Sequence, residues 1–159
     1  MRIEKTVVNA SPLILLCKSD LESLLPELFK EIVVPEAVWN EILIGDDIAS
    51  RKIQSVNWLI RKPIKIPDEI LVWNLGDGES EVLSFAFADK NFRAMVDDRA
   101  ARRCAKTLDI QTLGTGGMLI LAKRRGLIES ISESLSKLQD AGLWLSDEIA
   151  ELLKRQAGE

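Results

Sequence analysis

Short apolar runs rich in β-branched residues alternate along the chain with longer segments of helical periodicity. The short runs predict strands over Thr6–Asn9, Glu31–Val34, Trp58–Arg61, Ala94–Asp97 and Ile110–Leu113. The longer segments predict helices that begin near Ser11, Asp20, Pro35, Asp47, Asp77, Arg99 and Thr115. This alternation is typical of a parallel sheet covered by helices. The chain is therefore predicted to be an α/β protein with a central, mainly parallel sheet of five strands.

After Gly126 the pattern changes to two helices, expected over Glu129–Ala141 and Ser146–Gln156. Ser146 is a good N-cap for the second of them. No linker, low-complexity segment or repeat separates these helices from the preceding residues. We therefore expect a single domain over residues 1–159, with the helices of residues 129–157 packed on it or on a partner.

Composition supports a globular protein. The chain has 159 residues, of which 47% are hydrophobic and 29% charged, so it can bury a core. No apolar run approaches the roughly 20 residues that span a bilayer, and the N-terminus lacks a signal-peptide pattern. A cytoplasmic protein is expected. Cys17 and Cys104 are isolated within apolar helical stretches and are expected to be buried, reduced thiols.

The chain contains no histidine and no tyrosine. This excludes Ser-His-Asp and Cys-His catalytic groups, zinc sites built on imidazole, and metal-independent nucleases that use histidine. The chemistry that remains for an enzyme is a hard divalent cation held by Asp and Glu oxygens.

The net charge of -4 argues against a protein that coats nucleic acid nonspecifically. A nuclease with an acidic metal pocket and a local basic rim would also have a negative net charge. Two clusters could form such a rim or could be solvated helix faces: Arg99, Arg102, Arg103 and Lys106, and then Lys123, Arg124 and Arg125.

Polar residues follow two of the predicted strands, at the sheet edge where ligands of open α/β folds collect. Asn9 and Ser11 follow the first strand, and Asp97 ends a later strand with Asp98 beside it.

Two helical glutamates should join this edge. At about 100° per residue, Glu79 falls on the face of Val82 and Leu83, and Glu41 falls between Ala37 and Val38. A carboxylate that faces the core must be paired or bind a metal. Salt bridges to Arg99 or Arg103, or a capping role for Glu79, are the structural alternatives. The placement of all these residues at one edge favours a shared site. In it, at least three of Glu41, Glu79, Asp97 and Asp98 are expected to approach one cation.

Five segments in order carry a resemblance to a known family: VVNASPLILL, VPEAVWNEI, LGDGESEVLSFA, MVDDRAARRCAKTLDI and LGTGGMLILAKRRGLI. Together they resemble the PIN-domain family, in the branch with an SPLI segment near the N-terminus. The resemblance implies a three-layer sandwich with helices on both faces of the sheet. It also implies a Mg²⁺- or Mn²⁺-dependent endoribonuclease, often the toxin of a toxin–antitoxin pair.

The resemblance also assigns roles to residues. The catalytic positions fall on Asn9, Glu41, Glu79 and Asp97, and Asp98 joins the three acids as a metal ligand. Ser11 would orient the first ligand or a bound water. Ser11 and three arginines, Arg99, Arg102 and Arg103, are the expected RNA contacts.

Asn9 departs from the family pattern, because most PIN nucleases have aspartate there. An amide oxygen can ligate a cation but brings no charge, so metal affinity should fall, and only an inward-turned Asp98 could compensate. The alternative function is a catalytically weakened protein that binds RNA or an antitoxin-like protein without cleaving.

Three further expectations concern packing and partners. A homodimer is expected, with Leu143, Trp144, Leu145, Leu152 and Leu153 as a candidate surface. Gly114–Gly117 is read as a tight turn for close packing or as a backbone contact to RNA. Trp39, Trp58, Trp73 and Trp144 could stack on bases, but their apolar spacing favours a core or an interface.

Overall fold

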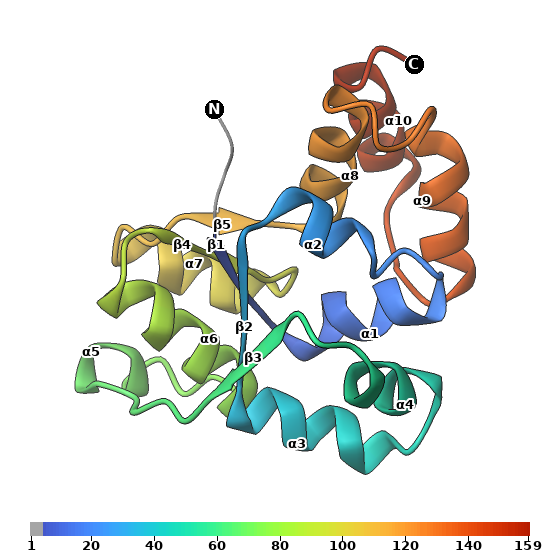
Figure 1. Cartoon of the computed structure of the whole chain (residues 1–159). Helices are drawn as coiled ribbons and strands as arrows, with labels where there is room; N and C mark the ends of the chain where they lie inside the picture. Colours follow the sequence, from blue (N-terminus) through green and yellow to red (C-terminus); the bar gives the residue numbers. More distant parts are fainter. Residues whose placement is uncertain (1–4) are drawn as a thin grey trace.

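A computed structural model describes residues 5–159 of the chain, so residues 1–4 of the expected domain lie outside the description (Figure 1). Its sheet has five strands: β1 (Lys5–Val8), β2 (Glu31–Pro35), β3 (Leu59–Lys62), β4 (Phe92–Met95) and β5 (Thr112–Leu113). The strand order is β3-β2-β1-β4-β5, and every neighbouring pair is parallel. The predicted fold class, a PIN-like α/β sandwich around a parallel sheet, is therefore confirmed.

Ten helices occur in the described part of the chain. The first five are α1 (Ala10–Lys18), α2 (Leu24–Leu28), α3 (Glu36–Gly45), α4 (Ile48–Ser55) and α5 (Asp68–Leu71). The others are α6 (Asp77–Ala88), α7 (Arg99–Thr107), α8 (Thr115–Arg124), α9 (Ile131–Asp140) and α10 (Asp147–Gln156). In Figure 1, α5–α7 lie to the left of the strands, and α1, α2 and α8–α10 lie to the right. Helices thus cover both faces of the sheet.

Several element boundaries differ from the expected ones; the strand expected over Ala94–Asp97, for example, is β4 at Phe92–Met95, two residues earlier. Two of the differences arise because helix C-caps extend into the connections. The helix expected near Asp20 begins only at Leu24, since Asp20 has a left-handed φ of 55° and ends α1. Similarly, Asp109 has φ 57°, and the Ile110 N–H donates to the Ala105 carbonyl at 2.8 Å. The Ile110 N–H therefore closes the C-cap that follows α7, and β5 is shorter than predicted.

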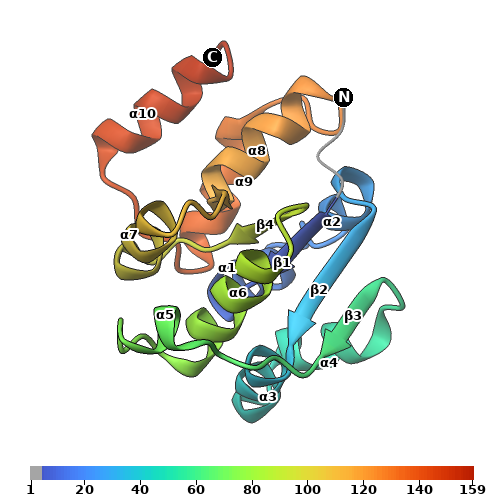
Figure 2. The same cartoon turned by 90° about the vertical axis from the view of Figure 1, so that its left-hand side faces the viewer.

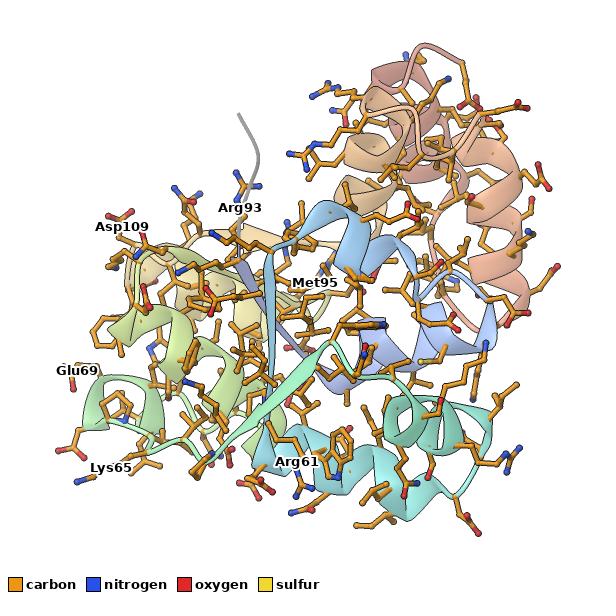
Figure 3. All side chains as sticks on the ribbon, in the orientation of Figure 1. Arg61, Lys65, Glu69, Arg93, Met95 and Asp109 are labelled. Atoms are coloured by element: carbon orange, nitrogen blue, oxygen red, sulfur yellow. The ribbon has the colours of Figure 1, made fainter. Side chains whose placement is uncertain are left out.

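The core lies on both sides of the three central strands. Val7, Val8 and Ala94 are completely buried, as parallel strands covered on both faces require. Met95 lies in this interior, whereas Lys65, Glu69 and Asp109 lie at the surface (Figure 3).

Both cysteines are buried and free, as expected. Burial, reinforced by the charge of Glu22, raises the pKa of the Cys17 thiol to about 12. Burial also raises the pKa of Cys104. The two thiols stay protonated at neutral pH and pack as small apolar groups.

The C-terminal helices pack on α8, and α9 also touches α1 (Figure 2). The Glu159 carboxylate fastens the end of the chain: it pairs with Lys123 at 2.8 Å and accepts from the Ile131 N–H at 2.7 Å. Ser146 is the N-cap of α10, as predicted, and accepts from the Ile149 N–H at 3.2 Å. A Cβ added to Gly116 would lie 2.8 Å from Leu153 Cδ1, so close packing of α8 against α10 accounts for this glycine. No helix within residues 5–159 is long and apolar enough to cross a membrane.

Candidate functional site

The segments that follow β1 and β4 leave the sheet side by side, at the carboxyl ends of the two strands. The ladder between these strands ends with Val8 opposite Met95, and the Asn9 N–H then donates to the Met95 carbonyl at 3.1 Å. Asn9 and Asp97 therefore leave the sheet at the same edge, as the strand-end reasoning predicted.

Asn9 and Glu41 converge on the bare Cα of Gly78 in the first turn of α6. A Cβ added to Gly78 would lie 3.2 Å from Asn9 Oδ1 and 3.2 Å from Glu41 Oε1. Asn9 is only 4% exposed and occupies the N-cap position of α1, yet its side chain makes no capping hydrogen bond. A buried amide oxygen that does not cap its helix is free to ligate.

Glu79 completes this first group. Its carboxylate folds back over the start of α6, where a Cβ added to Gly76 would lie 2.6 Å from Glu79 Oε2. Burial, and then the charge of Glu79, raise the pKa of Glu41. Glu41 is exposed as a residue, but its carboxylate end approaches Asn9 and Gly78, which explains the loss of hydration there. Two carboxylates that disfavour each other's charge would be stabilised by a cation between them.

Asp97 is held separately by the N-terminus of α8. The Thr115 N–H donates to Asp97 Oδ1 at 2.8 Å, and the Thr115 hydroxyl donates to Oδ2 at 2.5 Å. Thr115 is completely buried, so it is a rigid support. Gly114 leaves room for this contact, because a Cβ there would lie 3.1 Å from Asp97 Oδ1 and 2.7 Å from Arg102 Nη1.

Asp98 has a structural role at the start of α7. It is exposed and is the N-cap of α7, where its Oδ2 accepts from the Ala101 N–H at 2.9 Å. The structure thus shows this exposed carboxylate capping α7 and not turned inward to replace the charge that Asn9 lacks. Its role as a metal ligand stays a prediction.

Within residues 5–159 no three acidic or sulfur side chains lie close enough to hold one metal ion. The expectation that three of Glu41, Glu79, Asp97 and Asp98 share one cation is therefore not met. The reason is local: Asp98 caps α7, and Asp97 is tied to Thr115. The site instead consists of the Asn9–Glu41–Glu79 group and Asp97 on the neighbouring strand end.

These donors fit a hard divalent cation. All are amide or carboxylate oxygens, which suit Mg²⁺ and Mn²⁺ and not softer metals. Burial first, and then the negative charge of Glu79, raise the pKa of Glu41 at this point. Asn9, Glu41 and Glu79 are the residues of the first group that would hold an ion, with water and phosphate as its other ligands. Asp97, on the neighbouring strand end, would act from the side or hold a second ion.

The basic residues divide into two kinds. Arg99, Arg102 and Arg103 are exposed on α7 and together line a surface hollow of about 660 Å³, which fits their predicted role at a basic rim. The second cluster has structural contacts, because Lys123 pairs with Glu159 and Arg125 donates to the Leu28 carbonyl at 3.1 Å. Ser11 is exposed in the first turn of α1, and no hydrogen bond joins it to Asn9 in the described part of the chain.

Helix α3, which carries Glu41, is fixed by contacts that sequence reasoning missed. Pro35 precedes α3 and cannot cap it, so Glu81 of α6 accepts from the Ala37 N–H at 3.2 Å. Arg61 of β3 lies over the Trp39 ring at 4.6 Å and donates to Glu36 at 2.9 Å (Figure 3). Helical phase gives no sign that Glu81 has a partner on another helix.

Gly78→Ala is expected to weaken metal binding on the order of tenfold, because the new Cβ would push Asn9 Oδ1 and Glu41 Oε1 apart. Isothermal titration with Mn²⁺ measures this. Alanine also favours helix by up to about 1 kcal/mol, so the free energy of unfolding should change little. Gly45→Ala is the matched control, since its Cβ would meet nothing closer than 3.7 Å. Equal Mn²⁺ affinities in the two variants would contradict the site.

Comparison with known proteins supports the family resemblance. A family model described as a PIN domain matches residues 5–159. No curated protein matches the chain.

Proposed function

Since this chain belongs to the PIN domain family, a family of nucleases that are generally divalent-metal dependent, we propose that it is a Mg²⁺- or Mn²⁺-dependent endoribonuclease. The observation that carries the proposal is the convergence of Asn9 Oδ1 and Glu41 Oε1 on Gly78, with Glu79 close enough to raise the pKa of Glu41. The absence of histidine from the sequence agrees with metal-dependent chemistry.

The bound ion would polarise a phosphate of RNA and lower the pKa of a water molecule, as in other metal-assisted phosphodiester hydrolysis. The chain's own contribution is positioning. Thr115 fixes the orientation of Asp97 through two hydrogen bonds, and Glu81 fixes α3 and with it Glu41. The exposed guanidinium groups of α7 would hold neighbouring phosphates.

A specific observation also favours a second candidate function. Asn9 is neutral, and no three acidic groups converge within residues 5–159. A protein with weakened metal affinity would bind RNA or a protein partner without cleaving. The two functions differ in their response to metal.

Incubation of the protein with mixed RNA and Mn²⁺, with and without a chelator, tests the proposal. We expect cleavage with Mn²⁺ and none with the chelator, and Mn²⁺ binding by isothermal titration. RNA binding in a gel-shift assay, with intact RNA under both conditions, would instead support the noncatalytic alternative.

We further propose a homodimer and, as in toxin–antitoxin pairs, an antitoxin-like protein partner. Exposed Ile149 and Leu152 of α10, at 45% and 43% exposure, support a protein contact there. Of the expected surface, Leu143, Leu145 and Leu153 pack against the core of the same chain. Sedimentation at micromolar concentration tests the dimer. A monomer under these conditions would count against it.

A further inference from the structure

A groove of about 520 Å³ connects the candidate site with the C-terminal helices. Its lining includes Asp97 and Arg102, Gly114 and Gly116 at the start of α8, and Trp144 and Ile149 near α10. One continuous surface therefore contains both a proposed metal ligand and an aromatic ring. We propose that it binds single-stranded RNA, with one base stacked on Trp144. This inference rests on the proposed function and names the residue that positions its substrate.

Trp144 differs from the other tryptophans of the chain. Its side chain is 82% exposed, whereas Trp39 is 9% exposed and both Trp58 and Trp73 are partly buried against the core. Packing in the core accounts for the other three but not for Trp144.

The neighbours of Trp144 anchor the backbone from which its ring projects. Leu143 and Leu145 pack against the core on either side, and the Leu143 N–H donates to the Leu138 carbonyl at 2.9 Å. An aromatic ring that projects into solvent from an anchored backbone is available for a base to stack on it.

Charge complementarity favours RNA as the occupant. Arg102 lines both this groove and the neighbouring hollow, where Arg99, Arg103 and Lys106 add three cations against Asp109. RNA phosphates that lie along α7 would contact this basic surface on one side of Arg102. On the other side the groove is neutral and apolar, which suits a base.

The acidic residues of α10 lie beside this path, and their charge disfavours phosphates on that side. Asp147, Glu148 and Glu151 line a separate hollow together with Leu152 and Arg155. Only Ile149 is common to the two surfaces. An RNA strand would thus reach Trp144 with a base, while its phosphates remain on the side of α7.

The alternative occupant of this surface is a second copy of the chain. A dimer contact would use the apolar end, but it would not account for the continuity of the groove with Asp97 and Arg102. RNA accounts for both ends.

The test measures binding of a dye-labelled single-stranded oligoribonucleotide of about eight nucleotides by fluorescence anisotropy, in chelator so that the RNA is not cleaved. In the wild type we also expect the RNA to quench tryptophan fluorescence. We expect Kd to rise about tenfold or more in Trp144→Ala and to recover largely in Trp144→Phe. Leu152→Ala is the matched control, an exposed apolar residue of α10 outside the groove, and should leave Kd unchanged.

Two results would overturn the inference. One is equal RNA affinity of the wild type and Trp144→Ala. The other is a dimer that Trp144→Ala converts to monomer in sedimentation while RNA affinity stays the same, which would assign the surface to a second copy.

Cleavage assays with Mn²⁺ separate this inference from the proposed function. If the wild type cleaves RNA and Trp144→Ala has the same KM, the inference fails and the nuclease proposal stands. If RNA binds through Trp144 but is never cleaved, the inference stands and the nuclease proposal fails.

Discussion

Asp97→Asn is expected to reduce RNA cleavage about 100-fold or more. A metal ion contributes several kcal/mol of transition-state stabilisation, and each 1.36 kcal/mol is a factor of about ten in rate. The substitution removes the charge that would hold the ion at the end of β4. It leaves an amide oxygen that can still accept from the Thr115 N–H, so the local fold should survive. Single-turnover cleavage of a short RNA at saturating Mn²⁺ measures the effect.

Asp98→Asn provides a matched control for this loss. It makes the same chemical change one residue later, but the structure makes Asp98 the N-cap of α7. Asparagine caps helices about as well as aspartate, so neither stability nor cleavage should change much. If Asp98→Asn abolished cleavage as strongly as Asp97→Asn, then Asp98 would be a metal ligand and the capping role would be wrong.

The fold could be predicted from the sequence because its physical causes are local. Continuous apolar runs such as residues 32–34 are buried on both faces of a parallel sheet, and helical segments alternate with them. The errors arose where local chemistry allowed two outcomes. A helix is expected to begin near Asp20, and a strand is expected to begin directly after Asp109. Each of these aspartates instead adopts a left-handed φ that ends a helix. The short helix α5 (Asp68–Leu71) had too few residues for a periodic pattern.

The site could be predicted only in part, because strand ends and helical phase give positions but not partners. They brought Asn9, Glu41, Glu79 and Asp97 to one edge of the sheet. They could not tell which of two adjacent aspartates faces the site. That choice depends on Thr115, 18 residues away from Asp97, and on the start of α7.

Asn9→Asp is expected to tighten Mn²⁺ binding and to speed RNA cleavage. The new carboxylate would replace an amide oxygen that already lies against Gly78, beside Glu41 Oε1. At an effective dielectric constant of about 20 and a distance of about 4 Å, one added charge attracts a cation by several kcal/mol. Desolvation of the buried group and repulsion from Glu41 offset part of this gain. A net increase in Mn²⁺ affinity of about tenfold is the expected result.

The same substitution should lower the thermal stability of the protein when no metal is present. Position 9 is 4% exposed, and the pKa of Glu41 is already raised by burial and by Glu79. A further negative charge there lowers stability, so the Tm of Asn9→Asp in chelator should fall below that of the wild type. Saturating Mn²⁺ should reverse the order, because a ligand that binds the folded state stabilises it in proportion to the logarithm of its affinity.

Calorimetry measures the Mn²⁺ affinity, thermal unfolding measures the Tm, and an RNA cleavage assay measures the rate. The last two are done with Mn²⁺ and with chelator. Asn40→Asp is the matched control, since it adds the same charge at an exposed position of α3 next to Glu41 and should change none of them strongly. If neither the wild type nor Asn9→Asp binds Mn²⁺ or degrades RNA, the nuclease proposal fails. The noncatalytic binding protein would then be the better account, because restoring the charge at position 9 would not have been enough to restore the site.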